Sequence, residues 1–107
     1  MKTAPEQNIE PDRWVLVEFT QNGETYRKII SSWKGGWLQD SDCRISSRIV
    51  ESTVMQHFNE YKTETGSTYK CLHSKEGISE MIRDVITQLR ELNGNDSVRV
   101  ICYGDFT

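Results

Sequence analysis

The sequence has no long hydrophobic run, and its first residues carry no apolar segment of the kind found in a signal peptide. A membrane-spanning helix needs about 20 consecutive apolar residues, and no stretch of this chain approaches that length. We therefore expect a cytoplasmic protein with no membrane partner.

Cysteine is also scarce. Cys43, Cys71 and Cys102 are odd in number, lie far apart and form no Cys-x-x-Cys pair. A disulfide framework uses an even and denser set of cysteines. We expect these three residues to be reduced and mostly buried, where they act as small apolar side chains.

The chain has no excess of positive charge. Its 107 residues carry a formal net charge of −3, whereas domains that bind duplex DNA are usually basic as a whole. The length suits one domain with one core. Residues 1–12 are polar and contain both prolines, Pro5 and Pro11. This pattern predicts a flexible N-terminal arm, followed by a single domain over residues 13–107.

Runs of β-branched and aromatic residues predict strands along most of the domain. The predicted strands are residues 14–20, 25–30, 43–51, 54–61, 68–72 and 97–103. Asn22-Gly23 predicts a hairpin between the first two strands, and Gly35-Gly36 predicts a bulge or turn within a loop over residues 31–42. The last strand is apolar on both faces, which favours a central or well-covered position in a sheet.

Residues 74–92 predict the only helix. The apolar positions recur every three or four residues and form one stripe: Ile78, Met81, Ile82, Val85, Ile86, Leu89 and Leu92. Ser74 is a suitable N-cap, and Asn93-Gly94 a suitable end. The predicted fold class is α+β. It consists of a curved antiparallel sheet, open or in a partial barrel, with the helix on one face and a final strand after it.

No recognisable catalytic or metal-binding motif is present. Cys71 and His73 lie two residues apart and share one face of a predicted strand, but no third group is placed to orient them. His57 or Cys43 would complete a set of zinc ligands, although the spacing matches no zinc finger, knuckle or ribbon. We expect no catalytic residue, no metal and no cofactor.

The stretch from Tyr26 to Arg48, called the basic–aromatic segment below, is the most distinctive part of the chain. It holds two of the three tryptophans, the only Gly-Gly pair and five basic residues, whereas acidic residues outnumber basic ones from Glu51 onward. Aromatic and arginine anchors ringed by polar groups are typical of protein interfaces. The candidate binding residues are Tyr26, Arg27, Trp33, Lys34, Trp37, Arg44 and Arg48.

Several interpretations of this segment stay open. We favour a non-enzymatic interaction module that binds a protein partner. The alternative is a single-stranded nucleic-acid-binding protein that uses the same residues for base stacking and phosphate contacts, and a small cysteine/histidine enzyme comes third. A competing interpretation places Trp33 and Trp37 in the core. If the final strand is exposed, pairing with a second copy would give a homodimer.

Three short phrases stand between Trp33 and Cys71: SWKGGW, RISSRIVES and TGSTYKC. Together they resemble small uncharacterised β-rich proteins of phages and other mobile genetic elements. The likeness covers about a third of the chain, through Trp37, Ser46, Ser47, Ile49, Gly66, Ser67 and Tyr69. The resemblance implies a stand-alone accessory protein with no assigned chemistry, and it transfers no functional residue.

Overall fold

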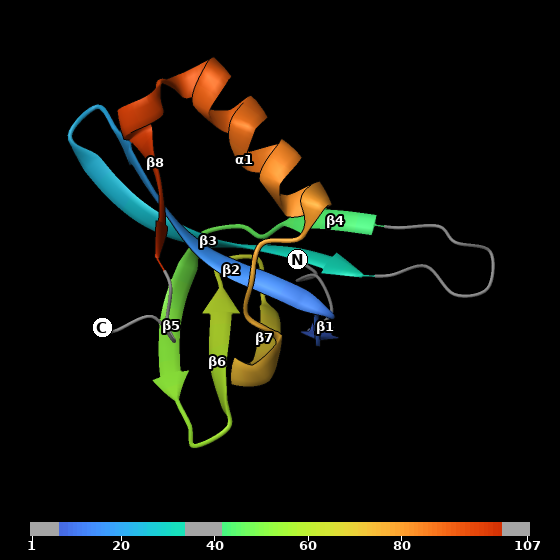
Figure 1. The fold of residues 1–107 in the computed structure, drawn as a ribbon. Coiled ribbons are helices and arrows are strands. Elements are labelled where there is room, and N and C mark those ends of the chain that lie inside the picture. Colours follow the sequence, from blue (N-terminus) through green and yellow to red (C-terminus); the bar gives the residue numbers. More distant parts are fainter. Residues whose placement is uncertain (1–6, 34–41, 102–107) are drawn as a thin grey trace.

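The computed structural model describes residues 7–33 and 42–101, which form eight strands, one α-helix and two short 3₁₀ helices (Figure 1). The elements are β1 (Gln7–Ile9), β2 (Arg13–Gln21), β3 (Glu24–Trp33), β4 (Asp42–Ile45), β5 (Ile49–Val54), β6 (Phe58–Thr63), β7 (Ser67–Leu72), η1 (His73–Lys75), α1 (Glu80–Asn93), η2 (Asn95–Ser97) and β8 (Val98–Ile101).

The strands divide into two four-stranded sheets. The central sheet has the order β4-β3-β2-β8, and the outer sheet has the order β1-β7-β6-β5. Helix α1 packs on one face of the central sheet, and the outer sheet lies on its other side (Figure 1). The predicted α+β class with mainly antiparallel strands is confirmed, but two sheets replace the single sheet that we expected, and β1 pairs with β7 in parallel.

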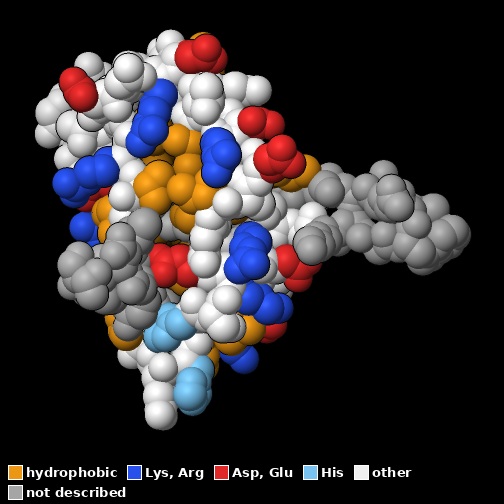
Figure 2. Space-filling model, viewed as in Figure 1, with side chains coloured by type: hydrophobic (Ala, Val, Ile, Leu, Met, Phe, Trp, Pro, Cys, Tyr) orange, Lys and Arg blue, Asp and Glu red, His pale blue; other side chains and the backbone are white. Residues whose placement is uncertain are grey.

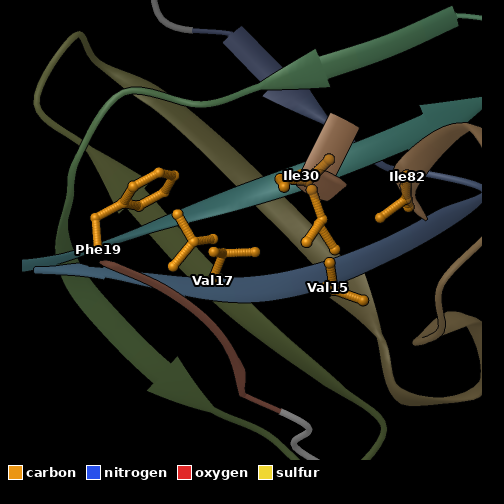
Figure 3. Close-up of a cluster of buried hydrophobic side chains, with 7 residues drawn as sticks. Val15, Val17, Phe19, Ile30 and Ile82 are labelled. Carbon is orange, nitrogen blue, oxygen red and sulfur yellow. The ribbon is translucent and has the colours of Figure 1, made fainter. Parts of the chain in front are cut away.

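The central sheet is buried on both faces because alternate residues of β2 enter two different cores. Val15 and Val17 contribute to a core beneath α1, together with Ile82 of the helix (Figure 3). Trp14 and Leu16 contribute to a second core between the two sheets. The first is called the helix-side core below, and the second the inter-sheet core.

The hairpin between β2 and β3 forms as predicted. Asn22 has φ 52° and Gly23 has φ 82°, and two consecutive positive φ values are the signature of the type I′ turn that suits a two-residue hairpin loop. The strands then pair in register from Arg13 opposite Ser32 to Gln21 opposite Glu24.

The prediction of one strand over residues 43–51 is wrong. The chain leaves the central sheet after β4 and enters the outer sheet at β5. Ser46, which is buried, bonds to the backbone of β3 after β4 has ended. Its Oγ accepts a hydrogen bond from the Ile29 N–H at 2.9 Å, and its own N–H donates to the Ile29 carbonyl at 2.9 Å. The Ser46 Oγ also donates to the Ser47 carbonyl at 2.7 Å. These bonds satisfy the N–H and the carbonyl of Ile29 on β3, and the chain then continues into β5.

The strand predicted over residues 54–61 is displaced as well, because the chain turns after Val54 and β6 starts only at Phe58. The strand predicted over residues 68–72 forms as β7, and its Tyr69 and Cys71 share the buried face as expected.

Helix α1 begins later than predicted. Its N-cap is Ser79, whose Oγ accepts from the Ile82 N–H at 3.2 Å, and Ser74 lies in the 3₁₀ helix η1. The segment between them is held against β2, where the Gly77 N–H donates to the Trp14 carbonyl at 2.9 Å. The predicted end is confirmed, because Gly94 is the C-cap at φ 100°.

Ordered structure starts earlier than the predicted arm allows. Gln7–Ile9 forms β1 against β7, and Ile9 packs on the inter-sheet core. The Asp12 N–H then donates to the Ser32 carbonyl at 3.1 Å. Residues 7–12 are therefore docked on the domain, and the remainder of the predicted arm lies outside the described residues.

The last strand lies at an edge, not at the centre. Among the described residues β8 pairs only with β2. Both of its faces nevertheless contact a core, since Val98 and Val100 contact the helix-side core and Ile101 contacts the inter-sheet core. The apolar pattern therefore indicates contacts with two cores, which an edge strand of a middle layer also makes.

Candidate functional site

The basic–aromatic segment does not form a single face. Along β3, Tyr26 packs against the helix-side core. The next residue, Arg27, lies on the opposite face of the strand, as Ile29 does. Arg44 is exposed on β4. Burial raises the pKa of the Tyr69 phenol, and the positive charge of the nearby Arg44 opposes this increase. Lys34 and Trp37 lie outside the described residues.

One group of predicted residues gathers around Tyr26. Its ring stacks on Phe19 with a centroid separation of 5.4 Å and an interplanar angle of 8°. The Arg48 guanidinium lies 4.3 Å from the centre of the Tyr26 ring, and the Lys28 ammonium lies 5.7 Å from it. Arg48 also approaches Glu24, with an Nη2–Oε1 distance of 3.7 Å. The Tyr26 ring is therefore already engaged by an aromatic and by a cation.

A second group surrounds Glu18 on the other side of β3. Arg27 Nε lies 3.3 Å from Glu18 Oε2, and Arg99 Nη2 lies 2.8 Å from Glu18 Oε1. The Glu18 side chain is 14% exposed, whereas both arginines are mostly exposed. Solvent-exposed ion pairs of this kind add little to stability, but they fix the position of the Arg27 guanidinium.

Trp33 lies apart from both groups. It is half-buried, belongs to neither core and donates from Nε1 to the Glu10 carbonyl at 3.0 Å. It borders a hollow of about 480 Å³ beside the start of α1, together with Arg13, Ser79 and Asp84. Among the described residues, Trp14 lies at the centre of a core, whereas Trp33 belongs to neither core.

Tyr26 and Arg27 both border a shallow groove of about 410 Å³ between the two sheets. Its other wall is the first part of β5, and Glu18 lies at its base. β5 pairs only with β6 among the described residues, and all of its residues except Ile49 are exposed. Val50 is 65% exposed and Val54 is 60% exposed. The unpaired side of β5 is called the β5 edge below.

Sequence reasoning missed the β5 edge. The run IVESTV has strand composition, but its apolar residues do not alternate regularly with polar ones as they do on a half-buried strand. The register shift between Ile49 and Glu51 places Val50 in an irregularity of the ladder. The sequence signal that could have identified this edge is the lack of a regular apolar face along the run, which predicts that its valines are exposed.

Cys71 is closed off from solvent, and His73 belongs to a hydrogen-bonded chain of side chains. Cys71 is fully buried, and burial raises the pKa of its thiol far above the ordinary value. His73 Nε2 hydrogen-bonds Asn59 Oδ1 at 2.9 Å, and Asn59 Nδ2 donates to the Tyr61 hydroxyl at 2.8 Å. Within residues 7–33 and 42–101, no three His, Cys, Asp or Glu side chains gather in a way that could hold a metal ion.

We expect Cys71 to resist alkylation at neutral pH. A raised pKa keeps the thiol protonated, and the thiolate fraction falls about tenfold for each unit of the shift. In a variant with Cys43→Ser and Cys102→Ser, the rate with iodoacetamide should be at least about a hundredfold below that of the urea-unfolded chain. A folded-state rate equal to the unfolded rate would contradict this expectation and support the enzyme interpretation.

No helix within the described part of the chain has the length and apolar character needed to cross a membrane. Comparison with protein-family models, with curated proteins and with solved structures finds no match to this chain. The resemblance to small proteins of phages and other mobile elements therefore stays a prediction, and the function must be argued from the geometry described above.

Proposed function

We propose that the protein is a non-enzymatic interaction module that binds an extended segment of a protein partner along the β5 edge. The observation that carries the proposal is the exposure of β5, where every residue after Ile49 is exposed and one side of the strand is unpaired among the described residues. An edge strand with exposed backbone donors and acceptors is a template for a further strand.

The groove beside β5 supplies the side-chain contacts that strand addition needs for specificity. Tyr26 and Arg27 line the groove, and the ion pair with Glu18 fixes the Arg27 guanidinium there. Val50 adds exposed apolar area on the strand itself. Tyrosine, arginine and a rim of polar groups are typical of interface hot spots. Two of the predicted binding residues therefore support this site directly, and Arg48 lies beside it over Tyr26.

The nucleic-acid alternative has weaker support. Base stacking needs an open aromatic face, but Phe19 and Arg48 already contact the Tyr26 ring. Phosphate binding needs uncompensated cations, but Arg27 lies against Glu18 and Arg48 lies near Glu24. These carboxylates would repel a phosphate backbone that followed the groove.

The proposal is tested with random displayed peptides of about ten residues, which exceeds the usual length of a strand. Binders selected on the native protein should lose about tenfold or more in affinity when Val50→Lys and Val54→Lys are combined, because the apolar area of the edge is replaced by charge. Leu92→Lys is the matched control, since Leu92 is 81% exposed on α1, and it should leave the affinity unchanged.

Two outcomes would contradict the proposal. One is a selection that enriches no peptide above the background of an unrelated protein. The other is a set of binders whose affinity is the same for the β5 variant and for the native protein. Circular dichroism of the variant checks that the lysines, which replace exposed residues, leave the fold intact.

A further inference from the structure

A second groove, independent of the β5 edge, lies on the opposite layer of the molecule. It runs along α1 above the central sheet, has a volume of about 380 Å³, and is lined by Ile78, Arg83, Ile86, Thr87, Arg90 and Val100. Figure 2 shows an apolar patch on the surface of this region, with basic side chains beside it. Ile78 is 42% exposed at one end, and Val100 of β8 is half-buried.

The groove exists because one helix does not cover a four-stranded sheet. Strands lie about 4.8 Å apart and a helix with its side chains is about 10 Å wide, so the face of the central sheet has room for about two helices. Only α1 packs on that face among the described residues. Its Ile82 and Ile86 are buried against the sheet, and the uncovered space lies beside them.

Within residues 7–33 and 42–101, the two arginines of the groove have no acidic partner. The ion pairs among the described residues involve Arg27, Arg48 and Arg99, but neither Arg83 nor Arg90. Arg90 Nε donates to the Val98 carbonyl at 3.2 Å, which anchors its guanidinium beside β8. Arg83 is exposed on α1, about two helical turns before Arg90. The groove therefore combines an apolar floor with two cations that form no ion pair with any carboxylate in the described part of the chain.

From this arrangement we infer that the groove binds an acidic amphipathic helix of a partner protein. Arg83 and Arg90 are separated by about 10 Å along α1, at 1.5 Å per residue. Carboxylates seven residues apart on a neighbouring helix have the same separation, and the apolar residues between them would face Ile86 and Val100. Helices packed side by side lie about 8–10 Å apart, which suits the space beside α1.

Charge argues against a second copy of this chain as the occupant. A copy related by a two-fold axis across the groove would bring Arg83 and Arg90 toward the same two arginines of the other copy. Like charges that face each other across an interface cost affinity. An acidic helix places opposite charges there instead.

The test uses a designed helical peptide with leucines at positions i, i+3, i+4 and i+7 and with glutamates seven residues apart beside them. Binding to the native protein should shift amide resonances of α1 and β8, and Arg83→Glu with Arg90→Glu should lower the affinity by at least about tenfold. Arg83→Glu alone should show part of this loss, and it leaves the bond of Arg90 to β8 intact. Lys62→Glu, on β6 of the outer sheet, is the matched charge control.

A lysine version of the peptide completes the design. It should bind the native protein weakly and bind the doubly reversed variant about as well as the glutamate peptide binds the native protein. Equal binding of both peptides, no binding of either, or shifts confined to the β5 edge would overturn the inference. Light scattering that shows a dimer of the protein alone, lost in Arg83→Glu, would assign the groove to a second copy and would also overturn it.

Discussion

Replacing Trp14 with alanine is expected to lower the free energy of unfolding by about 3–5 kcal/mol, the usual cost of removing a buried tryptophan side chain. Trp14 is fully buried on β2. Its ring lies 6.1 Å from the Tyr61 ring of β6, and its Nε1 donates to the Leu72 carbonyl at the end of β7 at 2.7 Å. One side chain therefore ties the central sheet to the outer sheet.

Urea denaturation monitored by circular dichroism measures this change. Trp33→Ala is the matched control, because Trp33 is half-buried and lies outside both cores, and it should cost only about 1 kcal/mol. Trp14→Phe retains an aromatic ring and removes the bond to Leu72, so its cost should fall between the two. Similar costs for Trp14→Ala and Trp33→Ala would contradict the assignment of Trp14 to the inter-sheet core.

Replacing Ile82 with alanine is expected to cost about 2–5 kcal/mol, the range measured for large-to-small changes in cores. Ile82 is fully buried on α1 and packs in the helix-side core, which includes Val15, Val17 and Ile30 of the central sheet. An isolated helix of this length is marginal in water, so the stability of α1 comes from this packing.

The same denaturation experiment tests this prediction, with Leu92→Ala as the control on the same helix. Leu92 is 81% exposed, and its replacement should change the free energy of unfolding by less than about 0.5 kcal/mol. If the helical ellipticity of Ile82→Ala is lost at a lower urea concentration than the signal of the sheets, Ile82 holds α1 on the central sheet. An unchanged stability for Ile82→Ala would mean that α1 does not pack on the central sheet.

The sequence predicts the features that depend on neighbouring residues. Asn22-Gly23 has the backbone freedom that a type I′ turn requires, and Gly94 ends α1 for the same reason. The alternation along β3 is also local, and it correctly separates Tyr26 from Arg27 and Ile29. These signals need no knowledge of the rest of the chain.

The features that sequence reasoning missed depend on residues far apart in the chain. The buried bonds of Ser46 to Ile29 divide a run of strand-forming residues between two sheets. The bond of Gly77 to Trp14 delays the start of α1. In each case a tertiary hydrogen bond outweighs local propensity, which is only a weak preference.

The candidate site was only partly predictable for the same reason. Tyr26, Arg27 and Arg48 do lie near one another. Tyr26 and Arg27 nevertheless lie in different environments, because they pair with different residues of β2: Glu18 is opposite Arg27, and Phe19 is opposite Tyr26. The β5 edge depends on which strand ends each sheet, and composition alone does not determine that order. The groove beside the arginines of α1 is not predictable from the sequence, because it forms only when the helix is placed on the sheet.

The most direct test of the central claim, strand addition at the β5 edge, is amide hydrogen exchange of the protein with and without a selected peptide. Added backbone hydrogen bonds should slow exchange at the β5 amides that do not bond to β6, by about tenfold or more at saturating peptide. Unchanged exchange along β5, with protection elsewhere in the molecule, would contradict the claim.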